Sequence, residues 1–127
     1  MLLLILFVLF YVVLPDKSLK ITAEELVSSY NSDILMADKK FLNKEIELTG
    51  NVKSFFQFEA EKSMLELHAP NNETKLYCIL MNNEAEEKAS SLTAGTIIMV
   101  YGKCLGLNPP SVKKFPNSIY IEAEGIK

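Results

Sequence analysis

The chain has 127 residues, of which 49% are hydrophobic and 23% are charged, and its net charge is −3. This length fits one domain with a core of its own. With two cysteines and one histidine, the chain lacks the residues for a zinc site of four cysteines or for a metal motif that needs a pair of histidines. All 13 basic residues are lysines, whereas proteins that bind DNA or RNA usually carry a basic excess and use arginine for bidentate contacts.

The N-terminal run of the chain is apolar. Residues 1–14 read MLLLILFVLFYVVL, and Pro15 and Asp16 end the run. As a helix it would span about 21 Å, which is short of the roughly 30 Å hydrocarbon core and typical of a signal-peptide core or a marginal anchor. No lysine precedes it and no A-x-A-like cleavage site follows it. We expect residues 1–15 to be a signal or membrane-anchor segment and residues 20–127 to form the folded domain.

The next segment has the pattern of an amphipathic helix. Thr22 and Glu25 form a capping box, which predicts that a helix begins there. The apolar residues that recur at helical spacing after it are Leu26, Val27, Tyr30, Ile34, Ala37 and Phe41. Lysines 39, 40 and 44 lie near the C-terminal end, where the helix dipole favours cations. The pattern predicts one helix over 22–40 that packs against a sheet.

From Glu45 the apolar period changes to two, which predicts a half-buried strand over 45–53 with a bend at Gly50. The further elements we expect are strands over 64–69, 76–81, 96–101 and 118–124 and a short helix over 84–91. Five short strands with a helix between the third and fourth indicate a mainly β OB-fold, a five-stranded Greek-key barrel. The third and fourth strands are apolar on both faces, so we expect the 22–40 helix to pack outside the barrel and cover its outer wall.

The sequence also resembles a known family. The matching pieces are TAEELVSSY, ADKKFLNKEIELTGNV, LYCIL and LTAGTIIMVYGKCLG, which span about residues 22–106. In these pieces the chain is similar to the tRNA_anti-like family of small, mostly bacterial OB-fold proteins without a settled function. The resemblance implies that the fifth strand lies between the third and the fourth. It also agrees with an N-terminal signal or anchor, because members of the family often carry one.

The two cysteines leave two interpretations open. Cys78 lies in the third strand and Cys104 follows the fourth. In an oxidising compartment they are candidates for a disulfide. By closing the loop between them, such a bridge would add roughly 3.5 kcal/mol to the free energy of unfolding in the chain-entropy model. Alternatively, both are reduced residues of the core, because cysteine behaves as a small hydrophobe.

Candidate ligand-binding residues lie in the loops expected after the first and fourth strands, where OB-folds bind ligands together with the face of strands 2 and 3. The aromatic and basic residues there are Phe55, Phe56, Phe58, Lys113, Lys114 and Phe115. Aromatic rings beside lysines suit bases and phosphates, but also a peptide, a saccharide or lipid headgroups. The alternative is structural, with Phe56 in the core and Phe115 closing the barrel end. His68 is interpreted as a lone surface histidine.

The function expected from the sequence is therefore a membrane-tethered or exported OB-fold binding module, extracytoplasmic and monomeric, with a protein or small-molecule partner. No catalytic residues, cofactor or metal are expected, because no pair of carboxylates has a neighbouring nucleophile. The alternative is a binder of single-stranded nucleic acid, which the acidic net charge and the lack of arginine disfavour.

Overall fold

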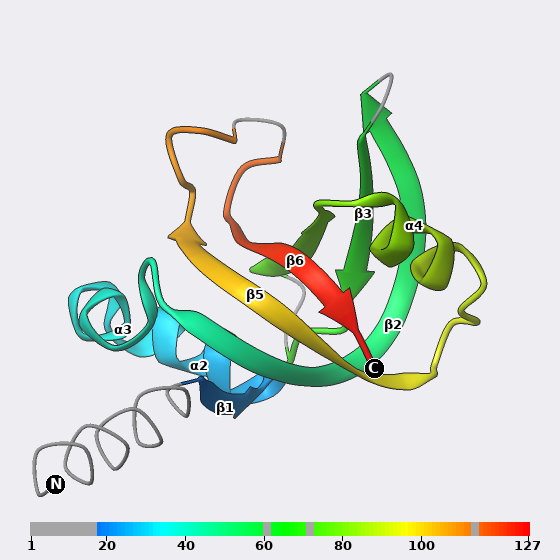
Figure 1. Cartoon of the computed structure of the whole chain (residues 1–127). Helices are drawn as coiled ribbons and strands as arrows, with labels where there is room; N and C mark the ends of the chain where they lie inside the picture. Colours follow the sequence, from blue (N-terminus) through cyan, green and yellow to red (C-terminus); the bar gives the residue numbers. More distant parts are fainter. Residues whose placement is uncertain (1–17, 60–61, 71–72, 113–114) are drawn as a thin grey trace, which may run out of the picture.

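The computed structural model describes residues 18–59, 62–70, 73–112 and 115–127 (Figure 1). Its elements are β1 (Leu19–Thr22), α2 (Ala23–Ser32), α3 (Ile34–Phe41), β2 (Glu45–Glu59), β3 (Lys62–Leu67), β4 (Lys75–Leu80), α4 (Asn83–Ser90), β5 (Ile97–Leu107) and β6 (Ser118–Ile126). The expected signal or anchor segment, residues 1–15, lies outside the described residues. None of the helices that the structure describes has the length and hydropathy needed to cross a membrane.

Five strands close into a barrel in the order β2-β3-β4-β6-β5, and β5 pairs back onto β2. The prediction of a five-stranded OB-fold barrel is thereby confirmed. Strand β6 lies between β4 and β5, parallel to the first and antiparallel to the second, as the resemblance implied. The short strand β1, which the sequence analysis did not identify, adds to β2 in parallel register outside this closed ring.

The long strand β2 belongs to both sides of the barrel. Its first half pairs with β5 as far as Asn51, and its second half pairs with β3 from Val52 onward. Gly50 lies close to this change of partner, and the register against β3 is irregular just beyond it, between Val52 and Ser54. A Cβ atom on Gly50 would lie 3.0 Å from the Cβ of Ala23 in α2, so the missing side chain lets the helix approach. The strand runs to Glu59 rather than ending at residue 53.

The predicted 22–40 helix is divided in two at Asp33. The capping box is confirmed: the backbone N–H of Glu25 donates to Thr22 Oγ1, and that of Thr22 donates to Glu25 Oε1, both at 3.1 Å. Asp33 is extended and caps α3 by accepting a bond from the backbone N–H of Met36 at 3.2 Å. Aspartate favours such a cap over a helix interior, so the chain turns there.

The helices close the barrel at its ends, and the expectation that the first helix covers its outer wall was wrong. The buried residues of α2 and α4, such as Leu26, Val27 and Ala89, join one cluster with the inward residues of all five barrel strands. In Figure 1, α2 and α3 lie at one side of the barrel and α4 at another. Strand β5 is also not buried on both faces: it alternates, and Ile97 at its start is 70% exposed.

Candidate functional site

The outer wall of β3, β4 and β6 carries an aromatic cluster. Its four rings, which we call the outer aromatic cluster, are Phe56, Tyr77, Phe115 and Tyr120. They come from β2, from β4, from the segment between β5 and β6, and from β6. This is the face on which OB-folds bind oligonucleotides and oligosaccharides, so the cluster is the candidate functional site.

The rings contact one another in the geometries that aromatic pairs prefer. Phe115 stacks on Tyr77 with a centroid separation of 4.8 Å and an interplanar angle of 24°. Tyr120 lies beside Tyr77 at 5.6 Å and 27°. Phe56 meets Tyr77 and Phe115 edge-on at 6.0 Å and 5.8 Å. Tyr77 is 6% exposed and Tyr120 is fully buried, whereas Phe56 and Phe115 are half-buried. A ligand at this face would therefore meet the two phenylalanines first.

The alternation of β4 explains why Tyr77 faces outward. Leu76, Cys78 and Leu80 join the core cluster of the barrel interior, so Tyr77 and Ile79 point to the other side. The sequence analysis noted that this strand is apolar on both faces and that something must cover its outside. The cover is Phe115, not the first helix.

The hydroxyl group of Tyr120 holds Phe115 in place. It accepts a hydrogen bond from the Phe115 backbone N–H at 3.1 Å and donates one to the Phe115 carbonyl oxygen at 3.2 Å. Phe115 belongs to the segment that connects β5 to β6, and Asn108 closes the base of this segment. The backbone N–H of Asn108 donates to the Ser118 carbonyl oxygen at 2.8 Å. The side chain of Asn108 accepts from the Ser118 N–H at 3.2 Å. Phe115 is thus attached to the barrel both by ring stacking and by its backbone.

Charged side chains border the cluster at Glu66. Its carboxylate lies 3.3 Å from the ammonium group of Lys53 and 3.9 Å from that of Lys75. The side chain of Ser54 donates to it at 3.3 Å. Glu66 is the ladder partner of Tyr77, and burial together with this negative charge raises the pKa of Tyr77 to about 12. The two lysines, whose side chains are each 40% exposed, place cationic groups beside the aromatic rings.

Leaving Phe55 aside, the predicted binding residues are Phe56, Phe58, Lys113, Lys114 and Phe115. The structure brings two of these together, Phe56 and Phe115. Both are partly buried against the buried rings of the outer aromatic cluster and not inside the barrel, so they pack against the fold, as the structural alternative had it, but at a different place. Phe55 is the neighbour that packs against the core cluster. Phe55 and Phe56 lie within β2, not in a loop after it.

The remaining predicted binding residues cannot be placed in the cluster. Lys113, Lys114 and the side chain of Phe58 lie outside the described residues. Tyr77 and Tyr120 were missed as members of the site. Their signal was parity: Tyr77 alternates with the inward Leu76 and Cys78 of β4, and Tyr120 with the inward Ile119 and Ile121 of β6.

Of the two interpretations of Cys78 and Cys104, the structure agrees with the reduced pair. Both cysteines are free and buried. Each is the ladder partner of Ile121, Cys78 from β4 and Cys104 from β5, so β6 lies between them. Strands two places apart are separated by about 9–10 Å, beyond the roughly 7 Å that two bridged Cα atoms allow. Burial raises the pKa of the Cys78 thiol to about 12 and also raises that of Cys104. The open alternative of two reduced core cysteines is the one the structure has.

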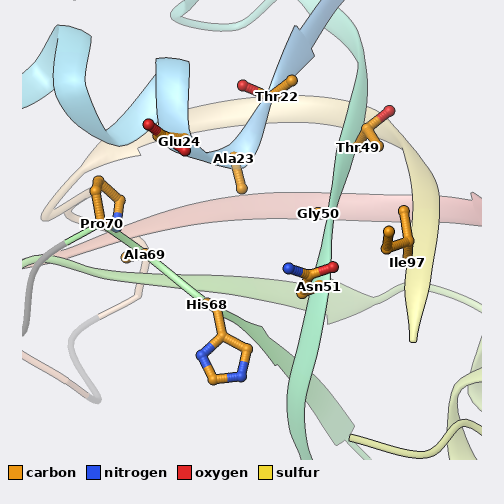
Figure 2. A pocket seen from close by; sticks show the side chains of 10 residues that line it. All are labelled: Thr22, Ala23, Glu24, Thr49, Gly50, Asn51, His68, Ala69, Pro70 and Ile97. Atoms are coloured by element: carbon orange, nitrogen blue, oxygen red, sulfur yellow. The ribbon is translucent and has the colours of Figure 1, made fainter. Parts of the chain in front are cut away.

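A second feature is an open groove of about 300 Å³ where α2 begins beside the middle of β2 (Figure 2). Figure 2 shows Thr22 and Glu24 at one side of the groove, His68 at the other, and Gly50 and Asn51 between them. His68 is exposed, as predicted for a lone surface histidine. Across the described residues, no group of three or more His, Cys, Asp or Glu side chains is arranged to hold a metal ion. The groove offers polar contacts from several elements.

Comparisons with known proteins agree with this fold. Residues 2–114 match the model of the tRNA_anti-like family. No curated protein matches the chain in sequence. Among solved structures, a candidate nucleic acid-binding lipoprotein from Klebsiella pneumoniae is similar, with a TM-score of 0.59 and 9% identity over 85% of this chain and 90% of that one.

Aminoacyl-tRNA synthetases contain similar domains. Asparaginyl-tRNA synthetase from Pyrococcus horikoshii matches with a TM-score of 0.53 and 16% identity over 69% of this chain and 19% of that one. The enzyme from Entamoeba histolytica matches with a TM-score of 0.54 and 11% identity, over 87% of this chain and 23% of that one. The chain spans about a fifth of the length of these enzymes, and at such identities the likeness is one of fold.

Proposed function

The chain belongs to the tRNA_anti-like family, and we propose that it is a non-catalytic OB-fold binding module held at a membrane by residues 1–15. The observation that supports a binding role is the outer aromatic cluster. It gathers four rings on the face where this fold binds its ligands, with Phe56 and Phe115 half-buried at its surface. The support for the tether is the apolar sequence of residues 1–14.

The chemistry of the site suits a ligand that has a flat surface and an anionic group. Phe56 and Phe115 offer ring faces and edges, on which planar groups stack. Lys53 and Lys75 lie beside the rings, and both are shared with the single carboxylate of Glu66. Two cations around one anion leave a net positive charge at this border.

Single-stranded nucleic acid is the second candidate ligand. It is favoured by the combination of rings and lysines on this face, since stacking contributes about 1–3 kcal/mol per base. The named similarity to a candidate nucleic acid-binding lipoprotein points the same way. The net charge of −3 and the lack of arginine weigh against it.

The tether is tested by flotation of the full chain with lipid vesicles. We expect the unaltered chain to float with the vesicles. The double variant Leu6→Glu and Leu9→Glu should remain behind, because a charge at the bilayer centre costs about 3 kcal/mol. Equal flotation of both chains, or of neither, would reject the tether.

The binding surface is tested by photo-crosslinking in native membranes. One chain carries p-benzoylphenylalanine in place of Phe56, and a matched control carries it in place of Ile97, which is 70% exposed elsewhere on the barrel. A specific adduct from position 56 and none from position 97 supports the site and identifies the ligand by mass spectrometry. The same adducts from both positions would reject it.

The two ligand classes are separated by titrating the full chain with a single-stranded oligouridylate. Binding that weakens steeply as salt is raised, and that Phe56→Ala reduces, would select the nucleic-acid candidate. Absence of salt-dependent binding would reject that candidate.

A further inference from the structure

Helix α3 exposes more apolar surface than any packing role requires. We call its exposed apolar residues and the one that follows the helix the α3 patch: Ile34 (48% exposed), Leu35 (76%), Met36 (60%) and Leu42 (36%). The inward side of the helix is already packed, because Ala37 and Phe41 are buried in the core cluster. The α3 patch is therefore free to contact something outside the domain.

Lysines follow the α3 patch on the same outward side of the helix. Lys39 lies four residues after Leu35, and Lys40 four residues after Met36, so each lysine is one turn from an exposed apolar side chain. Lys44 comes next, and its ammonium group donates to the Lys39 carbonyl oxygen at 3.2 Å. The surface thus combines apolar side chains with three cations.

The acidic residues of this region are already engaged. Asp33 caps α3. Asp38 accepts a hydrogen bond from the Tyr30 hydroxyl at 2.8 Å. Glu45 is the ladder partner of Lys103. Among the described residues no carboxylate lies within ion-pair distance of Lys39, Lys40 or Lys44. Lys40 has a longer-range electrostatic contact with Glu25, whose pKa it helps to lower, so Lys39 and Lys44 are the cations most accessible to an anionic partner.

The described chain begins beside this surface. Leu19, the second described residue, is the ladder partner of Ile46, which comes two residues after Lys44. Figure 1 shows β1 and α3 at the same side of the barrel. The first described residues of the chain therefore lie next to the segment that carries Lys44.

We propose that the α3 patch and its lysines lie on the surface of an anionic lipid bilayer, the apolar side chains among the headgroups and Lys39, Lys40 and Lys44 at lipid phosphates. This inference rests on the proposed tether. A short apolar segment alone binds a bilayer marginally, whereas a second contact beside it makes the attachment stable. An apolar protein partner, including residues 1–14 folded back onto the patch, would leave the three lysines without anionic partners.

An introduced tryptophan can test this contact by its fluorescence. The chain has no tryptophan of its own, so the signal comes from the introduced residue alone. Leu35→Trp places the reporter in the α3 patch of the full chain. Ile97→Trp places it at an equally exposed position at the start of β5, and serves as the matched control. Both variants are added to vesicles of phosphatidylglycerol and phosphatidylcholine, with and without bromine on the acyl chains. Leu35→Trp should shift to the blue and be quenched several-fold more than Ile97→Trp. Adding the charge-reversal substitutions Lys39→Glu and Lys40→Glu to Leu35→Trp should remove most of that quenching.

The outcomes distinguish this inference from the tether itself. Flotation without quenching of Leu35→Trp overturns the α3 contact and leaves the tether standing. Failure of the chain to float overturns the tether, and the α3 contact with it. A blue shift of Leu35→Trp in the absence of vesicles, without quenching by brominated lipid, shows that residues 1–14 or a second copy covers the patch, and also overturns the inference.

Discussion

The ring of Phe115 stacks on the ring of Tyr77 at 4.8 Å, although the two residues come from segments separated by α4 and the whole of β5. The Tyr120 hydroxyl secures this contact by two hydrogen bonds to the backbone of Phe115. The connection between β5 and β6 thereby covers an outer wall that would otherwise expose several apolar side chains. In the proposed binding role, the ring of Phe115 is also one of the two that a ligand would meet first.

Phe115→Ala should lower the free energy of unfolding by about 1–2 kcal/mol, because a half-buried ring contributes only part of the roughly 3–5 kcal/mol of a fully buried one. Tyr77→Ala should cost more, about 3–4 kcal/mol, because Tyr77 is almost fully buried and contacts the other three rings. Urea denaturation measures both. Equal costs for the two variants would contradict the arrangement of the cluster.

The stability of the domain should fall in alkaline solution. The pKa of Tyr77 is raised to about 12 by burial and by the charge of Glu66, whereas an unfolded tyrosine titrates near a pKa of about 10. The unfolded chain loses this proton first, so the contribution is complete below pH 10 and is lost as the pH rises from about 10 to 12. Tyr77→Phe keeps the ring and should lose less stability across that window. Tyr101→Phe, at an exposed position, is the control, and a pH profile of Tyr77→Phe identical to that of the unaltered chain would refute the assignment.

The two cysteines should be counted as thiols. Protein purified without reductant should give two equivalents with Ellman's reagent in urea, because β6 separates Cys78 from Cys104. In the native state the reaction should be slow, since burial raises the pKa of the Cys78 thiol to about 12 and shields the sulfur. Fewer than two thiols after denaturation would show a bridge and would mean that the strand register is different.

Gly102→Ala should destabilise the barrel far more than Gly50→Ala. A Cβ at residue 102 would meet the backbone oxygen of Glu122 within β6, which can move only if the ladder between β5 and β6 shifts. At residue 50 the nearest atom is the Cβ of Ala23, at 3.0 Å, and α2 can yield by a small displacement. We expect a loss of about 1–3 kcal/mol for Gly50→Ala and loss of cooperative unfolding for Gly102→Ala. Thermal melts followed by circular dichroism measure both variants. A larger loss of stability for Gly50→Ala than for Gly102→Ala would contradict this prediction.

Local patterns were enough to predict many of the elements. The capping pair Thr22 and Glu25 and the strand that begins at Glu45 were identified correctly, because a helix cap and the period of a strand depend on neighbours within a few residues. Asp33 was the local exception: its own capping preference divided a helix whose apolar spacing looked continuous.

Only the tertiary structure decided what covers the barrel and where the site lies. The sequence predicted that the outside of β4 is covered, but the choice between the first helix and Phe115 depends on contacts between distant segments. The same is true of the cysteines, whose separation follows from β6 pairing between β4 and β5 at Ile121. Hydrophobic burial is non-directional, so any apolar group that covers this face of β4 stabilises the fold to a similar extent. Strand pairing and the two hydrogen bonds of Tyr120 place Phe115, and not the helix, over Tyr77.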